Sequence, residues 1–281
     1  VSRPSPAASR SASATRSRSV SEQRKSPGPR TSGAPSTLTD LMASPEHLRV
    51  QAERENGPVY EPPETIARGD GVLGELALRR RSGDQPVYEL IVNGVFLMDS
   101  AETSTERLLA EEVLRRSPQP RRVLVGGLGL GYTVRALLDD PRVERIDVIE
   151  IEPLLVEWLR ADLVPGTAAI VHDDRVHVTT QDIATFLATT EPATYDAALL
   201  DVDNGPDFLV HDSNAAVYQP GVLSSAVRAV RSGGMVAVWS AAPSTELAAR
   251  LAALGARIEH VIAEVVRAER RLTYHLYLAH L

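Results

Sequence analysis

From Arg122 onward, short apolar segments alternate with longer segments of helical periodicity. Because such repeats return the chain to the same edge of a sheet, they predict an α/β fold with a doubly wound, Rossmann-like parallel sheet and helices on both faces. The expected strands are 122–126, 145–150, 175–180, 195–201 and 234–240. The expected helices are 131–139, 153–164, 182–189, 214–231 and 244–254. Two strand-like segments follow, "ARIEHVIAEVVRA" and "LTYHLYLAH", and predict a terminal antiparallel hairpin.

The chain before this repeat divides into two parts of different composition. Residues 1–37 are rich in Ser, Arg and Pro and lack an apolar stretch, so we expect a disordered tail. Residues 38–100 contain short alternating runs split by Gly, Asp and Pro, which predict a small N-terminal β element. Residues 101–281 then form the α/β domain, starting with a helix in "SAETSTERLLAEEVLRR" that a Ser or Thr of residues 100–103 caps.

Composition excludes several classes of protein. The chain has no cysteine, and no window approaches the roughly 18 apolar residues of a membrane span. The net charge is −7 although residues 1–37 hold six Arg and one Lys against one Glu, so the remainder is strongly acidic. An acidic body argues against nucleic acid as a partner and suits a small or cationic substrate. The seven histidines lack metal-ligand spacing, so we expect no metal. Because the chain has no membrane-length apolar window and no cysteine, we expect no membrane as a partner and a cytoplasmic protein.

A glycine cluster stands where the first strand of the repeat becomes a helix. Gly127, Gly129 and Gly131 occupy alternate positions in "VGGLGLGYTV". Glycine lets the backbone approach a ligand closely, and the next helix points its N-terminus at that place. The pattern fits a tight turn without a ligand, a dinucleotide site or a site for an adenosyl sulfonium compound. The dinucleotide fingerprint places its third glycine one residue later, where this chain has Tyr132.

Carboxylates follow the next two expected strands. Glu150 ends the strand 145–150, where a carboxylate can accept hydrogen bonds from both ribose hydroxyls, although an exposed acid at a strand end is the alternative. Glu152 is expected to cap or flank the helix that starts at Pro153. Asp182 follows the strand 175–180 and can accept from an adenine amino group beside the backbone of Ile183, or cap its helix, or do both.

Three more acids follow the fourth strand. Asp201, Asp203 and Asp207 fall within seven residues, around a turn at Asn204. Clustered acids repel one another unless a cation binds, so an amine substrate would stabilise them. A carboxylate beside a nucleophilic amine can hold it and take its proton. We therefore predict Asp201 and Asp203 as catalytic residues, with a solvated acidic turn as the alternative.

These motifs resemble the spermidine synthase-like family of polyamine aminopropyltransferases, within the class I S-adenosylmethionine-dependent methyltransferase fold. The resemblance rests on "VLVGGLGLGYTVRALL", "IDVIEIEPLLVEWLR", "DDRVHVTTQDIATFL" and "YDAALLDVDNGPD". It implies a transferase whose Gly127, Gly129 and Gly131 hold a sulfonium nucleoside. It also implies that Glu150 holds the ribose, that Asp182 and Ile183 hold the adenine, and that Asp201 is the catalytic acid. Family members are commonly dimers or tetramers, so a homo-oligomer fits the resemblance.

The half of the family pattern that binds the polyamine is less complete. Leu130 stands where the family has an Asp that engages the aminopropyl chain, and Asn204 stands where it has a second acid. The first helix keeps acids such as Glu102, Glu106 and Glu112 but lacks the family's Tyr and His. The resemblance thus implies transfer of an aminopropyl group from decarboxylated S-adenosylmethionine, or of a methyl group from S-adenosylmethionine. The acceptor is a small amine such as a polyamine. A methyltransferase unrelated to polyamines and a non-catalytic nucleoside-binding protein are the alternatives.

Overall fold

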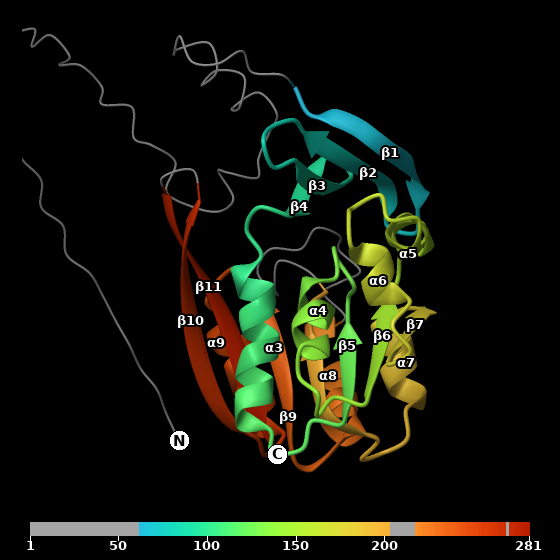
Figure 1. Cartoon of the computed structure of the whole chain (residues 1–281). Helices are drawn as coiled ribbons and strands as arrows, with labels where there is room; N and C mark the ends of the chain where they lie inside the picture. The colour runs from blue at the N-terminus through green and yellow to red at the C-terminus, as the bar shows by residue number, and fades with distance from the viewer. Residues whose placement is uncertain (1–61, 203–216, 268–269) are drawn as a thin grey trace, which may run out of the picture. The chain divides into compact units, whose positions relative to one another are not determined.

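The computed structural model describes residues 62–202, 217–267 and 270–281, and these form two β-sheets with associated helices (Figure 1). The smaller sheet is antiparallel, and its strands pair in the order β1-β2-β3-β4. Their bounds are β1 Glu64–Gly71, β2 Gly74–Arg81, β3 Val87–Val92 and β4 Val95–Asp99. This sheet is the β element expected before the core.

The larger sheet has seven strands in the order β10-β11-β9-β8-β5-β6-β7. Strands β5 to β9 pair in parallel, whereas β11 is antiparallel to β9 and to β10. The bounds are β5 Arg122–Gly126, β6 Arg145–Glu150, β7 Val176–Thr180, β8 Tyr195–Leu200, β9 Val230–Ser240, β10 Arg257–Arg267 and β11 Arg270–His280. The predicted α/β class and the terminal hairpin are therefore confirmed.

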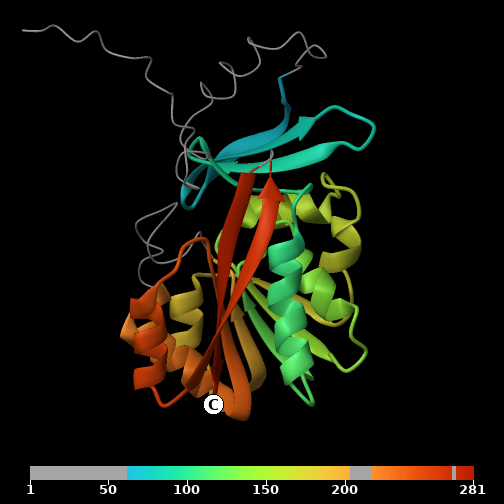
Figure 2. The same ribbon diagram turned by 90° about the vertical axis from the view of Figure 1, so that its left-hand side faces the viewer.

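Helices cover both faces of the larger sheet, as Figure 1 and the rotated view of Figure 2 show. The alternation of side chains along β5 explains the two layers: Val123 and Val125 pack with α3 to α6, whereas Leu124 packs with α7 to α9. The bounds are α3 Ser104–Arg116, α4 Tyr132–Leu138, α5 Pro153–Arg160, α6 Thr167–Val171, α7 Ile183–Thr189, α8 Pro220–Ala229 and α9 Thr245–Ala253.

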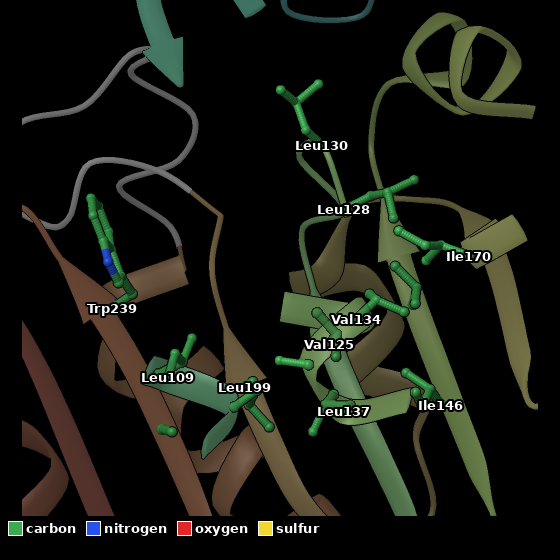
Figure 3. Packing of buried hydrophobic residues seen from close by; sticks show 14 of the residues in the cluster. Leu109, Val125, Leu128, Leu130, Val134, Leu137, Ile146, Ile170, Leu199 and Trp239 are labelled. Carbon is green, nitrogen blue, oxygen red and sulfur yellow. The ribbon is translucent and has the colours of Figure 1, made fainter. Parts of the chain in front are cut away.

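The core on the α3–α6 side is continuous with the small sheet. Figure 3 shows Val125 of β5 near Leu137 of α4, and Leu109 of α3 near Leu199 of β8, among the buried side chains of this layer. Leu78 and Leu90 of the small sheet are buried in the same cluster. The small sheet therefore shares its core with the α/β domain, which brings its inner face close to the carboxyl edge of the parallel strands.

Two predicted elements differ from the structure. The helix expected over 153–164 ends at Arg160, and α6 follows as a separate short helix that the pattern did not predict. Two left-handed residues explain the break: Asp162, with φ +57°, follows the end of α5, and Gly166, with φ +87°, precedes α6. The helix expected over 214–231 is α8, which starts at Pro220 and ends at Ala229, where β9 begins earlier than expected; residues 214–216 lie outside the described part.

The start of α3 also differs in detail. Thr103 occupies the N-cap position, but its side chain does not cap the helix. The carboxylate of Glu102 accepts instead from the backbone N–H of Ser104, at 2.9 Å. Leu109, Val113 and Leu114 are among the residues that form the buried face of this helix. No helix in the described part of the chain is both long and apolar enough to cross a membrane.

Candidate active site

A cavity lies at the carboxyl edge of the parallel strands. The strand order sets the order of side chains along it: Trp239 at the end of β9, Asp201 after β8, Gly127 after β5, Glu150 at the end of β6 and Asp182 after β7. Ligands of open α/β sheets bind at this edge. The small sheet and the segments beside it supply the apolar wall: Leu73, Leu76, Leu90, Val92, Leu97 and Met98.

The glycine loop between β5 and α4 needs two of its glycines for close approach. Gly127 has φ +92°, and a Cβ built on it would lie 2.1 Å from the carbonyl oxygen of Asp201. Gly129 has φ +51°, and its Cβ would lie 2.8 Å from the sulfur of Met98. Both line the cavity, whereas Gly131 does not; it is the left-handed residue at the N-cap of α4. Two of the three predicted glycines therefore face the cavity.

Glu150 is buried at the end of β6 and is fixed by backbone donors on both sides. Its Oε2 accepts from Leu128 N–H at 2.7 Å, and its Oε1 accepts from Glu152 N–H at 2.9 Å. Burial raises the pKa of this carboxyl, and the hydrogen bonds oppose that rise. A carboxylate has about four lone-pair directions, so Glu150 retains capacity to accept from two hydroxyls of a ligand.

Asp182 and Ile183 line the cavity at the end near β7. Asp182 is the N-cap of α7, and its Oδ1 accepts from Thr185 N–H at 2.8 Å. The predicted capping role is thus present, and one carboxylate can also accept a further hydrogen bond. Ile183 is buried and lies close to Gly126: a Cβ built on that glycine would be 3.1 Å from Cγ1 of Ile183.

Asp201 faces the middle of the cavity beside the glycine loop. Thr133 of α4 donates its hydroxyl to Oδ2 of Asp201 at 2.7 Å. Burial raises the pKa of Asp201 to about 6, although the Thr133 hydrogen bond opposes the rise. The other predicted catalytic residue, Asp203, lies outside the described residues together with Asn204 and Asp207.

Glu106, one of the acids that the first helix keeps, also lines the cavity, although the sequence did not predict it as a catalytic or binding residue. Its side chain accepts from the Thr105 hydroxyl at 2.8 Å. Burial, and then the negative charge of Asp201, raises the pKa of Glu106 to about 7. The available signal was its helical position, because Glu106 stands three and seven residues before the buried Leu109 and Val113. An acid on the apolar face of a helix is unusual enough to indicate a site.

Three other side chains at or near the cavity have well-defined surroundings. Leu130 is fully buried and is not among the residues that line the cavity. Trp239 fills hydrophobic space against Tyr274, with ring centroids 5.3 Å apart, and also lines the cavity. Glu152 stands at the N-cap of α5 but does not cap it; its carboxylate accepts from backbone N–H groups of the small sheet. No group of three or more potential metal ligands occurs among the described residues.

A parallel sheet that ends in a reversed hairpin, with a cavity at its carboxyl edge, defines the class I S-adenosylmethionine-dependent transferase fold. The family model described as "Spermine/spermidine synthase domain" matches residues 102–266, so the chain belongs to this family.

Similar proteins carry related names. A polyamine aminopropyltransferase of Mycobacterium tuberculosis (strain ATCC 25618 / H37Rv) is 31% identical over 181 residues, which are 63% of this chain and 33% of that protein. Putrescine N-methyltransferase 4 of Nicotiana tabacum is 31% identical over 161 residues, 54% of this chain and 40% of that protein. Both names denote transferases. In each case the match spans less than half of the relative's length.

Solved structures show the same fold. A spermidine synthase in complex with the transition-state analogue AdoDATO has a TM-score of 0.67 at 16% identity, and the match covers 77% of this chain and 73% of that structure. The spermidine synthase from Thermotoga maritima has a TM-score of 0.66 at 16% identity, and the match covers 82% of this chain and 83% of that structure. At this identity the likeness concerns the fold.

Proposed function

We propose that this protein is a transferase that binds an S-adenosyl sulfonium nucleoside and transfers its aminopropyl group to a small amine, such as a polyamine. One observation carries the proposal: a single cavity holds Asp182, Glu150 and Asp201 in the order of their strands, with Glu106 of α3 beside Asp201. That order matches the sequence of an adenine, a ribose, a sulfonium centre and an amine along one bound pair of substrates. The names of the relatives support the same reaction class.

The nucleoside half of the cavity has donors and acceptors suited to adenosine. Glu150 accepts from the two ribose hydroxyls, and its backbone hydrogen bonds keep it oriented toward the glycine loop. Asp182 accepts from the adenine amino group, while Ile183 supplies an apolar contact for the ring. The bare backbone at Gly127 and Gly129 admits the nucleoside close to the strand edge, whereas Gly131 shapes the turn into α4.

The amine half rests on two carboxylates. The sulfonium centre makes the adjacent carbon electrophilic, so the protein must align an amine for displacement and remove a proton. Asp201 accepts that proton, and its raised pKa of about 6 brings it closer to the operating pH than an ordinary Asp. Glu106 adds a second negative charge that attracts the cationic amine. Asp203 is proposed as a further catalytic acid from the sequence pattern.

The charge of the cavity favours the decarboxylated donor. The cavity side chains described include Glu106, Glu150, Glu152, Asp182 and Asp201 but no Arg, Lys or His. The amino-acid end of intact S-adenosylmethionine carries a carboxylate, which these acids would repel without a compensating cation. Methyl transfer from the intact compound is the second candidate, because the putrescine N-methyltransferases match this chain as well as the aminopropyltransferases do.

Calorimetry with three nucleosides tests the proposal. Decarboxylated S-adenosylmethionine is expected to bind more tightly than S-adenosylmethionine. Methylthioadenosine, the nucleoside that aminopropyl transfer leaves behind, is expected to bind as a product. Mass spectrometry after incubation with putrescine should then show an added aminopropyl group. Preference for the intact compound with an added methyl group would select the second candidate. Binding of none of the three would reject the transferase and leave a scaffold role.

A pair of variants tests the catalytic acid. Asp201→Asn should abolish transfer while nucleoside affinity stays within about twofold, because the substitution removes the proton acceptor but keeps the shape. Asp174→Asn is the matched control, since Asp174 is an exposed acid outside the cavity. Full activity of Asp201→Asn would refute the role given to Asp201.

A further inference from the structure

The turn between β1 and β2, residues 71–74, is bound to the α/β domain through one buried carboxylate. Glu152 is 4% exposed, and its Oε2 accepts from Val72 N–H at 2.8 Å. Its Oε1 accepts from Leu73 N–H at 2.6 Å. Hydrogen bonds from backbone N–H groups to an ionised acceptor are short and strong, and both oxygens are engaged at once. This pair of bonds joins segments that lie 79 and 80 residues apart in the chain.

The turn is shaped to fit that carboxylate. A Cβ on Gly71 would lie 2.2 Å from Oε2 of Glu152, so only glycine leaves room for the contact. On the other side, Asn93 donates through Nδ2 to the Leu73 carbonyl at 2.6 Å and accepts through Oδ1 from Glu75 N–H at 3.0 Å. The turn is therefore held from both the α/β domain and its own sheet.

Glu152 continues this contact to the glycine loop. Its backbone N–H donates to Oε1 of Glu150, whose Oε2 accepts from Leu128 N–H. A chain of hydrogen bonds thus runs from the β1–β2 turn through Glu152 and Glu150 to the loop. Leu73, Glu152, Glu150 and Leu128 all line the cavity. A displacement of the turn therefore acts on the orientation of the Glu150 carboxylate.

We propose that Glu152 is a positioning residue that couples the β1–β2 turn of the small sheet to Glu150, so that the turn sets the affinity of the nucleoside half of the cavity. The ligand in this statement rests on the proposed function, whereas the coupling between turn and loop does not. The small sheet then does more than supply an apolar wall of the cavity: through Glu152 it orients the carboxylate that recognises the ribose.

Glu152→Gln tests the coupling, because the amide places an N–H donor opposite the N–H of the turn and removes the charge. Amide hydrogen exchange in the free protein should become faster at Val72 and Leu73 and also at Leu128. The Kd of methylthioadenosine should rise about tenfold, a change that corresponds to about 1.4 kcal/mol. The KM of the acceptor amine should stay within about twofold, and that separation distinguishes positioning from general loss of structure.

Two further variants complete the experiment. Glu75→Gln neutralises a more exposed acid of the same hairpin, which pairs with Arg68 at 3.5 Å, and should leave all three measurements unchanged. Gly71→Ala presses on Glu152 from the turn and should reproduce the Glu152→Gln result; it replaces that variant if Glu152→Gln does not fold.

The outcomes separate the coupling from the proposed function. Faster exchange confined to Val72 and Leu73, with Leu128 unchanged, would overturn the coupling. Unchanged exchange at the turn would overturn it as well. If the wild type binds no nucleoside, the proposed function fails, and exchange at Leu128 still decides whether Glu152 couples the turn to the loop.

Discussion

Asp201→Asn is expected to stabilise the folded protein at neutral pH while it removes transferase activity. Two of the cavity carboxylates, Asp201 and Glu106, lie close together, and burial makes each costly to ionise. Because Asp201 ionises first, its charge then opposes the ionisation of Glu106. The neutral amide of Asn keeps the shape of the side chain, and it eliminates both the cost of ionising Asp201 and the repulsion that Asp201 exerts on Glu106.

The magnitude follows from the pKa of Asp201, which rises from 3.8 to about 6. Since one pKa unit corresponds to about 1.4 kcal/mol, the ionised group costs the folded state about 3 kcal/mol relative to the unfolded chain. A raised pKa means that the folded state holds the proton more tightly. The stabilisation of the folded state by protonated Asp201 is therefore fully present below about pH 4, and it is lost as the pH rises through about 6.

Urea unfolding of wild type and Asp201→Asn between pH 4 and pH 8 measures this effect. The free energy of unfolding of the variant, relative to wild type, should increase by about 3 kcal/mol across that range. Asp174→Asn provides the control, because the exposed acid that it replaces lies in water in both states. A difference between Asp201→Asn and wild type that stays constant with pH would refute the reasoning.

Three further substitutions test other parts of the site by urea unfolding. Gly127→Ala should destabilise by several kcal/mol because its Cβ meets the Asp201 carbonyl, whereas Gly166→Ala, at a similar φ with nothing within 4 Å, should cost only about 1–2 kcal/mol; equal losses would contradict the close approach. Asp182→Ala should cost about 1 kcal/mol as the N-cap of α7 is lost, and Asp182→Asn should cost less, because Asn also caps helices well; equal costs would argue against the cap. Protonated Glu106 stabilises the folded state, and this contribution is lost between about pH 4.5 and 7 as the pH rises through its raised pKa. Glu106→Gln should therefore remove the Glu106 share of the fall in stability over this range; an unchanged profile would contradict its burial.

The fold could be predicted because the alternation of apolar strand segments with helical segments reflects the burial of apolar side chains between the sheet and its helices. Alternate residues of β5 face two different helix layers, so apolar residues had to fill both faces of each strand. Boundaries were less accurate where backbone conformation decides them. The left-handed residues Asp162 and Gly166 separate α5 from α6, and apolar periodicity alone does not show such a break.

The site was predictable where chemistry follows directly from a strand end. Gly127, Glu150, Asp182 and Asp201 all stand there, and all line the cavity as expected. Glu106 comes from a helix outside the repeating units, so its approach to Asp201 depends on tertiary packing.

Glu152 shows the same limit more strongly. Its partners Val72 and Leu73 are backbone groups of a distant turn, and no side-chain motif marks them. A local contact of this kind, such as the helix cap at Asp182, follows a sequence pattern, but the contact of Glu152 with a turn about 80 residues away is visible only in the assembled fold.

A crystal structure of the protein with methylthioadenosine tests the central claim most directly. The account predicts both ribose hydroxyl oxygens within about 3.2 Å of the Glu150 carboxylate, with the adenine beside Asp182 and Ile183. A nucleoside bound elsewhere, or a ribose in this cavity that does not contact Glu150, would contradict it.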